Sequence, residues 1–248
     1  MTDRNMIRQW IGGLGLSLLL GCSAVAESNH FYFVQITDTH IGSLDHASRL
    51  ERIVASINAL PFPIECVLHS GDIGADNLLR PDMVEQTLTI MGRLRAPVYY
   101  VPGNHDIMFR KPSATMAVYT NRFGPLCTSV ECHGVVFVTL HTDPLRRRMT
   151  AGAFDPLSEL ERTIAETAGK PVIMVQHHPP VDDFFDNRMR VGWDPDIRNR
   201  WARIIRTGNV RAVITGHFHR DELHWIEGIP IFVCAPVAGY WGRQGSFR

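Results

Sequence analysis

Residues 31–40 have the sequence FYFVQITDTH, in which an apolar run over residues 31–36 is followed at once by Asp38 and His40. The run is rich in aromatic and β-branched residues, which is typical of a strand that is buried on both faces. Further runs of this kind cover residues 64–68, 98–101, 135–140, 172–175, 210–214 and 229–234. Their recurrence predicts a layered α/β domain with largely buried strands.

Segments with helical periodicity separate several of these strands. Residues 44–60 place five apolar side chains on one helical face: Leu50, Ile53, Val54, Ile57 and Leu60. A second helix should begin at Pro81 and end near Arg95, before the helix breaker Pro97. Because 248 residues with 45% hydrophobic composition can bury a full core, we expect one large catalytic domain over residues 27–248.

The charge balance argues against one class of partner. Lys+Arg and Asp+Glu each total 25, so the chain lacks the basic excess that a nucleic-acid backbone usually requires. We therefore expect no nucleic-acid partner. The 12 histidines are unusual, because His is the commonest side-chain ligand of metal ions and also titrates near neutral pH.

The N-terminal residues are typical of an export signal. Arg4 and Arg8 precede an apolar run over residues 10–20, which is too short to cross a bilayer but has the length of a signal-peptide core. Cleavage after the A-V-A sequence at 24–26 would release a soluble protein, whereas the L-L-G-C sequence at 19–22 resembles a lipobox and would leave a lipid on Cys22. We expect a signal over residues 1–26 and a periplasmic or lipid-anchored protein, with a cytoplasmic location as the alternative if the signal is not a true one.

The remaining cysteines are few. Cys66 and Cys234 lie in apolar runs and are expected to be buried core residues. Cys127 and Cys132 lie five positions apart in a turn-rich stretch. In an exported protein they could form a local disulfide bond, and the sequence leaves the bridged and unbridged alternatives open.

Polar residues that can bind metal ions follow the predicted strands at five points. The motifs are D-T-H at 38–40, G-D at 71–72, G-N-H-D at 103–106, H-H-P-P at 177–180 and G-H-F-H at 216–219. Each motif alone also occurs as an ordinary strand end or turn. Because the carboxyl ends of strands share one edge of such a sheet, the whole set predicts a single site built from distant parts of the chain.

The residue types in these motifs suit metal chemistry. In an extended segment, Asp38 and His40 would leave the same face and could bind one ion. The Asp72 carboxylate has two oxygens and could bridge two ions. In the G-N-H-D motif, the amide of Asn104 offers a neutral oxygen ligand, His105 could donate a proton to a leaving group, and Asp106 could orient that imidazole.

The ordered set of motifs resembles the calcineurin-like metallophosphoesterase superfamily, and all five signature blocks of that superfamily have a counterpart here. The resemblance runs from about residue 31 to the end and includes the Y-x-x-x-F-G-P sequence at 119–125. With H-H-P-P, this sequence is most similar to the class III cyclic-nucleotide phosphodiesterase and glycerophosphodiesterase branch. The resemblance implies a four-layer α/β/β/α sandwich with two mixed sheets and a dinuclear metal site at the carboxyl ends of the strands.

The resemblance also implies a role for each residue of the site. One metal ion would be bound by Asp38, His40 and His219, the other by Asn104, His177 and His217, and Asp72 would bridge the two. His105 would act in catalysis without binding a metal. The implied ligand is the first His of H-x-P-P, so His178 would be structural or would line the substrate pocket.

The activity implied by the resemblance is hydrolysis of a small-molecule phosphate ester, by in-line attack of a hydroxide that bridges the two metal ions. Nitrogen and oxygen ligands without a thiolate favour Fe, Mn, Zn or Co. A phosphodiester of the cyclic-nucleotide or glycerophosphodiester type is the expected substrate, and a phosphomonoester or pyrophosphate is the alternative. A non-catalytic metal-binding scaffold is a remote alternative, because none of the expected ligands is missing.

Substrate choice should depend on the loops outside the metal-binding motifs, at residues 107–117 and 182–196. In the second loop, Arg188 and Arg190 could hold phosphate, and Trp193 could stack on a base. These side chains could equally pack against the helix that follows. The resemblance further implies strands beyond residue 248, so we expect a short or truncated member, in which an open sheet edge would favour a dimer. Contact with a membrane would come only from a lipid on Cys22.

Overall fold

The structure is a computed structural model that describes residues 30–147, 152–182, 193–239 and 245–248. Residues 31–248 form one compact unit. Within the described residues, no helix combines the length and the apolar character needed to cross a membrane. The expected export signal, including Cys22, lies outside the described residues.

Strands and helices alternate through most of this unit. The strands are β1 (Phe33–Ile36), β2 (Cys66–His69), β3 (Val98–Tyr100), β4 (Cys127–Cys132), β5 (Val135–Leu140), β6 (Val172–Gln176), β7 (Val210–Thr215), β8 (Glu222–Ile226) and β9 (Ile229–Val233). The helices are α1 (His46–Asn58), α2 (Pro81–Met91), α3 (Pro112–Arg122), α4 (Asp143–Arg147), α5 (Pro156–Glu166) and α6 (Pro195–Thr207).

The strands form two sheets. One has the order β1-β2-β3 and the other has the order β4-β5-β6-β7-β9-β8. The six-stranded sheet is mixed as expected, because β4 and β8 pair antiparallel with their neighbours. The three strands of the other sheet are parallel, since helical crossovers join them. On the outer edge of β1, Arg248 and Gln35 exchange two backbone hydrogen bonds of 2.6 and 3.0 Å, which is an antiparallel pair.

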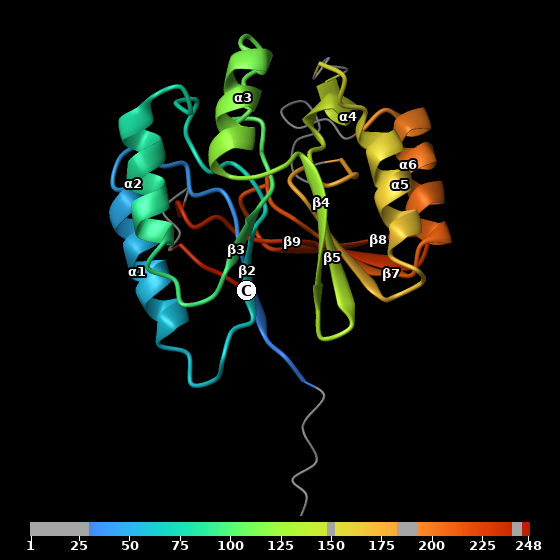
Figure 1. The fold of residues 1–248 in the computed structure, drawn as a ribbon, viewed down its shortest axis with the longest axis horizontal. Coiled ribbons are helices and arrows are strands. Elements are labelled where there is room, and N and C mark those ends of the chain that lie inside the picture. The colour runs from blue at the N-terminus through green and yellow to red at the C-terminus, as the bar shows by residue number, and fades with distance from the viewer. Residues whose placement is uncertain (1–29, 148–151, 183–192, 240–244) are drawn as a thin grey trace, which may run out of the picture. The chain divides into compact units, whose positions relative to one another are not determined.

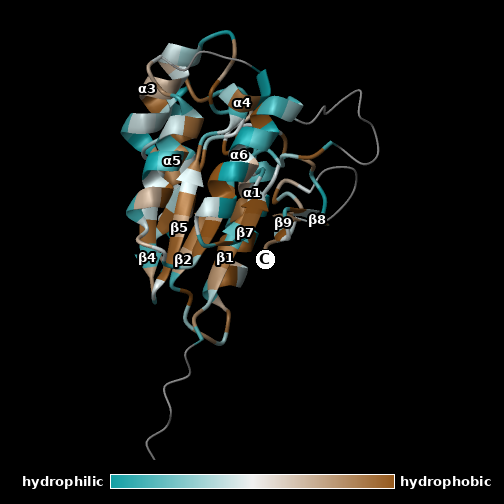
Figure 2. Ribbon diagram, turned by 90° about the vertical axis from the view of Figure 1, so that its right-hand side faces the viewer, coloured by the Kyte–Doolittle hydropathy of each residue, from teal (hydrophilic) through white to brown (hydrophobic). Residues whose placement is uncertain are grey.

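Four layers follow from how the helices cover these sheets. Helices α1 and α2 lie against the three-stranded sheet, and α5 and α6 lie against the six-stranded sheet (Figure 1). A third apolar cluster fills the space between the sheets and includes Leu68, Val101, Phe137, Val175 and Ile214. In Figure 2 the strands are mainly brown (hydrophobic), and the helices that cover them carry many teal (hydrophilic) residues. The predicted four-layer α/β/β/α sandwich is thus confirmed.

The helices confirm the periodicity of the sequence. Leu50, Ile53, Val54 and Ile57 of α1 are buried, and Pro81 is the first residue of α2. Proline is favoured there because its fixed backbone angle suits a first helical turn and its missing N–H costs no helical hydrogen bond. Helix α2 ends at Met91, four residues before the predicted end at Arg95.

Two strands were not predicted, and one of them decides the disulfide question. Strand β4 spans both Cys127 and Cys132, and both thiols are free. At about 3.3 Å per residue, the ends of a six-residue strand lie too far apart for a disulfide bond, which needs Cα atoms within about 7 Å. The bridged alternative is therefore wrong. Cys66 and Cys234 are buried, as predicted.

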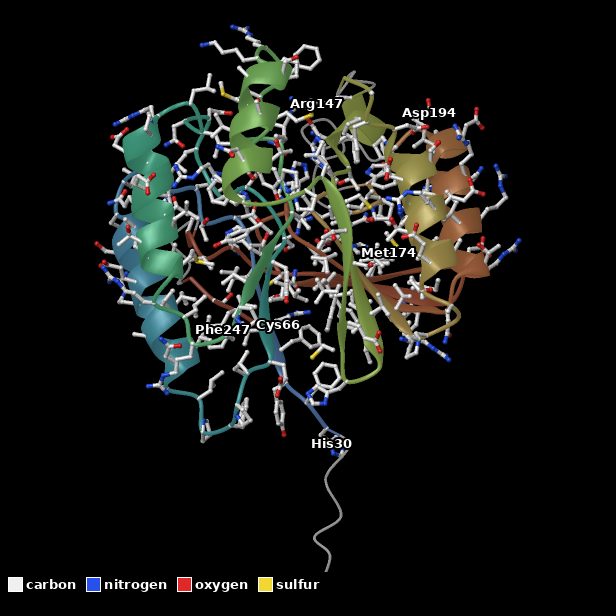
Figure 3. All side chains as sticks on the ribbon, viewed as in Figure 1. His30, Cys66, Arg147, Met174, Asp194 and Phe247 are labelled. Carbon is white, nitrogen blue, oxygen red and sulfur yellow. The ribbon has the colours of Figure 1, made fainter. Side chains whose placement is uncertain are left out.

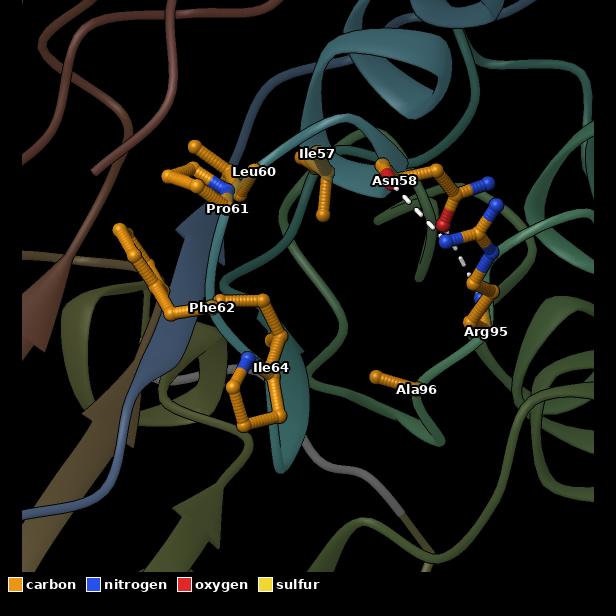
Figure 4. A pocket seen from close by; sticks show the side chains of 9 residues that line it. Ile57, Asn58, Leu60, Pro61, Phe62, Ile64, Arg95 and Ala96 are labelled. Atoms are coloured by element: carbon orange, nitrogen blue, oxygen red, sulfur yellow. Dashed lines mark hydrogen bonds between the residues drawn. The ribbon is translucent and has the colours of Figure 1, made fainter.

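A surface hollow lies at the end of the sheets where the strands begin. Its volume is about 460 Å³, and it is lined by the loop between α1 and β2 and by Arg95 and Ala96 before β3 (Figure 4). Arg95 donates backbone and side-chain hydrogen bonds to Asn58 on its rim. None of the residues predicted to bind metal lines this hollow.

The core between α6 and the six-stranded sheet should dominate stability. Trp201 is fully buried there, whereas Trp225 on the edge strand β8 is 62% exposed. Replacement of Trp201 by Ala should lower the free energy of unfolding by about 3–5 kcal/mol, because it removes a large buried side chain and leaves a cavity. The matched change Trp225→Ala should stay within about 0.5 kcal/mol. Denaturant unfolding of both variants measures the difference, and equal losses would contradict the burial of Trp201.

Candidate dinuclear metal centre

The loops that follow strands of both sheets converge on one site. The loops after β1, β2 and β3 carry Asp38, His40, Asp72 and Asn104, and the loops after β6 and β7 carry His177, His217 and His219. All seven side chains are at least nine-tenths buried. In the structure, these loops therefore converge at the carboxyl ends of the strands, as predicted.

Four of these residues form the first ligand group: Asp38, His40, Asp72 and His219. Asp38 Oδ1 lies 3.0 Å from His219 Nε2 and 3.7 Å from His40 Nε2. The other carboxylate oxygen of Asp38 accepts hydrogen bonds from the Thr37 hydroxyl and from the backbone N–H of His217. One oxygen of Asp38 is thus held by the protein while the other faces the imidazoles.

The second ligand group consists of His177, His178 and His217. The rings of His177 and His217 lie 5.1 Å apart, and those of His178 and His217 lie 4.5 Å apart. His177 Nδ1 lies 2.8 Å from the backbone oxygen of Ser70, to which it donates when protonated. This hydrogen bond leaves Nε2 of His177 as the nitrogen with a free lone pair for a metal ion.

Asn104 joins the second group through His178. Asn104 Oδ1 lies 3.1 Å from His178 Nε2, and the Thr142 hydroxyl lies 3.2 Å from His178 Nδ1. With the Thr142 hydroxyl donating to Nδ1, the Nε2–H donates to Asn104. This arrangement fixes the orientation of the amide and gives both ring nitrogens of His178 a hydrogen-bond partner.

Asp72 lies between the two groups. Its Oδ2 is 3.1 Å from His177 Nε2 and 3.7 Å from His40 Nε2. Its Oδ1 accepts a hydrogen bond of 2.9 Å from the backbone N–H of His105. A single oxygen, Oδ2, therefore faces both groups, which is the position that a bridging ligand needs.

The backbone at the site is unusual. Five of the ten non-glycine residues with positive φ among the described residues are Asp38, His40, Asp72, His217 and His219. Such conformations cost free energy and persist where the surrounding structure enforces them, often at functional sites. The prediction that Asp38 and His40 lie in an extended segment is wrong. Their side chains reach one site because both residues are left-handed, while Thr39 between them contacts His69 and the Ile73 carbonyl.

Two glycines permit the close approach of these loops. A methyl group on Gly103 would overlap the carboxylate and backbone of Asp72, and one on Gly216 would overlap Thr37 and Asp38. Any larger residue at either position would displace a carboxylate of the site. The glycines of the G-N-H-D and G-H-F-H motifs therefore have a steric reason.

The electrostatics of the site suit cations. Burial opposes ionisation of Asp72, yet the neighbouring charge and hydrogen bond of His177 hold its pKa well below the usual range. Burial likewise opposes protonation of His177, but Asp72 and Asp38 raise its pKa to about 9. A positive charge between these side chains is strongly favoured, and a metal ion can take the place of the proton. Buried imidazoles and carboxylates are suitable ligands for divalent metal ions.

Asp106 does not have the predicted role. Its carboxylate accepts hydrogen bonds from the backbone N–H groups of Ile73, Gly74 and Gly103, so it ties the G-N-H-D loop to the loop after β2. The side chain near His105 is instead Asp76, whose Oδ2 lies 3.0 Å from His105 Nδ1. The predicted Asp106–His105 pair is thus corrected, because the three backbone donors already occupy Asp106.

One polar segment of the site was missed. His141, Thr142 and Asp143 follow β5 and are fully buried, and Asp143 Oδ1 lies 3.5 Å from His178 Nε2. These residues follow the fourth of the predicted strands, as the other polar motifs follow theirs, so the same rule would have found them. Burial chiefly lowers the pKa of His178, and the charges of His217, His177 and Arg146 lower it further.

The predicted substrate residues are only partly described. Trp193 is 4% exposed and packs edge-on against Trp201, with 5.5 Å between ring centroids. It belongs to the core beneath α6, so the prediction that it stacks on a substrate is wrong. Arg188 and Arg190 lie outside the described residues.

Comparison with known proteins agrees with this geometry. The calcineurin-like phosphoesterase family matches residues 31–221. The chain belongs to this family. It is 30% identical over 215 residues to a probable cyclic nucleotide phosphodiesterase of Rhodopseudomonas palustris, covering 81% of this chain and 76% of the relative. It is 27% identical over 248 residues to a serine/threonine-protein phosphatase of Mus musculus, covering 86% of this chain and 77% of the relative.

A solved structure supports the fold. A dimetal phosphatase from Danio rerio superposes with a TM-score of 0.61 at 16% identity, covering 84% of this chain and 88% of the other. Together with the two ligand groups, family membership makes this calcineurin-like phosphoesterase a metal-dependent hydrolase of phosphoric esters that uses a pair of metal ions. The resemblance seen in the sequence is thereby confirmed.

The position of Asp72 gives a direct test of the pair. Asp72→Asn should abolish loading of both metal ions and hydrolysis, because it removes the charge from the oxygen that faces both groups. Asp76→Asn is the matched control, since it makes the same change of charge four residues away and should leave two metal ions bound. Metal analysis of the purified variants measures the outcome. Full metal content in Asp72→Asn would contradict the bridging position.

Proposed function

We propose that this calcineurin-like phosphoesterase hydrolyses a small-molecule phosphodiester, of the cyclic-nucleotide or glycerophosphodiester type. The observation that carries the proposal is Asp72 Oδ2, which faces imidazoles of both ligand groups from distances of 3.1 and 3.7 Å. The similarity to a probable cyclic nucleotide phosphodiesterase supports the choice of a diester.

We assign the ligands as follows. One ion takes Asp38, His40 and His219, the other takes Asn104, His177 and His217, and Asp72 is shared. The two metal ions, which we expect to be Fe, Mn, Zn or Co, would supply an activated water and neutralise charge on the phosphate. The distances within the two groups support this division, as do Asp38 Oδ1 and Asp72 Oδ2, which face the imidazoles of the site.

His105 is positioned to act as the proton donor. Its side chain is 36% exposed, unlike the buried ligands, and its Nε2 lies 4.0 Å from Asp72 Oδ2. Asp76 contacts its other ring nitrogen and can stabilise the protonated imidazole. In the reaction, a water oxygen attacks phosphorus, the bond from phosphorus to the ester oxygen breaks, and His105 gives that oxygen a proton.

Arg146 is a further candidate for substrate binding. It belongs to α4, which begins at Asp143 of the missed segment, and its charge acts on both His178 and Asp143. A guanidinium can bind two phosphate oxygens at once. We therefore assign Arg146 a role in holding the phosphate of the substrate. The sequence suggests the same role for Arg188 and Arg190.

Two alternative functions could use the same site. A phosphomonoester substrate is supported by the similarity to a serine/threonine-protein phosphatase, and a pyrophosphate would use the same site. A metal-binding scaffold without activity would retain the ligands but would have no use for His105. We also propose export, with residues 27–248 as the catalytic domain and residues 1–26 as its signal, either cleaved or lipidated at Cys22, on the sequence features alone.

The role of His105 can be separated from metal binding. His105→Ala should keep both metal ions and lower kcat by about 10²–10⁴, the usual contribution of a general acid. The loss should be larger for an alkyl ester than for a nitrophenyl ester, because nitrophenolate leaves without a proton. Steady-state kinetics on both esters measure it. Equal losses on the two esters would exclude proton donation by His105.

The substrate class needs a panel of esters. Cyclic nucleotides, glycerophosphodiesters and phosphomonoesters should be compared by release of alcohol or phosphate, with Mn and with Fe/Zn loaded. We expect the highest kcat/KM on a diester, and Arg146→Gln should raise KM more than it lowers kcat. A rate on monoesters that far exceeds every diester rate would overturn the diester proposal while leaving the metal site intact.

A further inference from the structure

A second set of metal-ligating side chains lies away from the site described above. Glu65, Cys132 and His133 each offer a ligand atom, and the three atoms lie within 4.8 Å of one another. Glu65 immediately precedes β2 of the three-stranded sheet, whereas Cys132 and His133 lie where β4 turns into β5 of the six-stranded sheet. These are the amino ends of β2 and β5, opposite the dinuclear centre. Figure 3 labels Cys66, the neighbour of Glu65, in the lower part of the molecule. Arg147, the last residue of α4, is labelled in the upper part.

The geometry points to a binding site for one further divalent cation, preferably Zn²⁺, held by Glu65, Cys132 and His133. The bound cation would join the two sheets. A thiolate, an imidazole and a carboxylate are the three side-chain ligand types that zinc accepts. The dinuclear centre contains no thiolate among its ligand groups, so the two sites differ in chemistry as well as in position.

The distances need little adjustment. Ligand atoms that lie about 2.0–2.3 Å from a tetrahedral ion are about 3.3–3.8 Å apart. His133 Nε2 and Glu65 Oε2 are already 3.5 Å apart. Because all three ligand atoms lie within 4.8 Å, side-chain rotations of partly exposed residues can close the rest. Water would complete the coordination.

The surroundings hold two of the ligands in place. Cys132 packs at the rim of the core between the sheets, and the His133 ring stacks on Phe31 at 5.1 Å and 15°. The backbone N–H of Glu65 donates to the Tyr32 carbonyl, which fixes the start of β2. Burial and the nearby charge of Glu65 raise the pKa of the Cys132 thiol, so a bound cation would displace its proton to solvent.

The turn that carries His133 is a tight one. His133 and Gly134 form the two-residue connection between β4 and β5, with φ of 48° and 80°. Asn-Gly is the preferred sequence for such a turn, because both residues need positive φ. Histidine is, like asparagine, enriched among residues with positive φ, so this turn can present the imidazole of His133 beside Cys132.

A cobalt titration tests the site directly. Co²⁺ bound to a thiolate gives a charge-transfer band in the near ultraviolet, to which the dinuclear centre cannot contribute without a thiolate ligand. The full chain, in a Cys22→Ser background and under reducing conditions, is first loaded at the dinuclear centre with Mn²⁺ and then titrated with Co²⁺. We expect the band to saturate at one equivalent per chain and to disappear when Zn²⁺ is added.

Matched variants identify the ligands. Cys132→Ser should abolish the band, and Cys127→Ser, at the other end of β4, should leave it unchanged. His133→Asn suits the turn and should weaken Co²⁺ binding by at least about tenfold, since even loss of a partner of a ligand costs that much. Glu65→Gln should weaken it in the same direction, with Glu131→Gln as its control. Without added Zn²⁺ or Co²⁺, hydrolysis by the manganese-loaded variants should be unchanged, because none of these residues belongs to the dinuclear centre.

Stability provides an independent readout. Zn²⁺ should raise the Tm of the manganese-loaded protein, and the rise should be absent in Cys132→Ser because the ion no longer joins the two sheets. The proposal fails if no thiolate band forms at about a hundredfold excess of Co²⁺, since a site that weak would not hold zinc at cellular concentrations. It also fails if Cys132→Ser retains the band or the rise in Tm. Neither outcome depends on which ester the enzyme hydrolyses.

Discussion

The site depends on a buried carboxylate whose two oxygens do different work. In Asp72, Oδ1 accepts the backbone N–H of His105, and Oδ2 faces imidazoles from both ligand groups. A buried carboxylate without partners would be expelled or protonated, so each oxygen needs a compensating charge or donor. The backbone N–H of His105 satisfies Oδ1, and the positive charge favoured beside His177 and His40 satisfies Oδ2. Asp38 repeats the arrangement, with one oxygen bonded to Thr37 and the His217 backbone and the other facing two imidazoles.

That arrangement requires loops from two sheets to approach closely, and the sequence meets the requirement with unusual backbone. Gly103 and Gly216 leave no room for a side chain between the loops and the carboxylates. Asp106 then joins three backbone N–H groups across two loops, so the loops are held before any metal ion binds. Left-handed residues at five ligand positions add strain that this network must offset. The protein thus prepares the ligand positions through its own hydrogen bonds.

The sequence predicted most of the fold and the site because the relevant signals are strong and local. Buried strands read as continuous apolar runs, and polar motifs at their carboxyl ends must meet at one edge. Strands β4 and β8 were missed because their residues alternate between exposed and half-buried, and β8 even exposes Leu223 and Trp225. The His105–Asp76 contact could not be predicted, since it depends on a left-handed Asp76 in a loop without regular spacing. Trp193 was misassigned because an aromatic residue before a helix serves the core as readily as a ligand.

The dinuclear centre also depends on packing far from its ligands. Three of the loops that form it belong to one sheet and two belong to the other, so the separation of the two ligand groups is set by how the sheets pack. Side chains such as Leu68, Phe137 and Val175 fix that distance, and Gln35 donates across the interface to the Thr215 carbonyl. At the amino ends of the strands, the sheets meet through the side chains packed around Cys132 and through the 3.5 Å contact between His133 Nε2 and Glu65 Oε2. A cation bound there by Glu65, Cys132 and His133 would restrain the same interface from the opposite end. Because protein interiors resist small displacements, a restraint at one end of two packed sheets limits motion at the other.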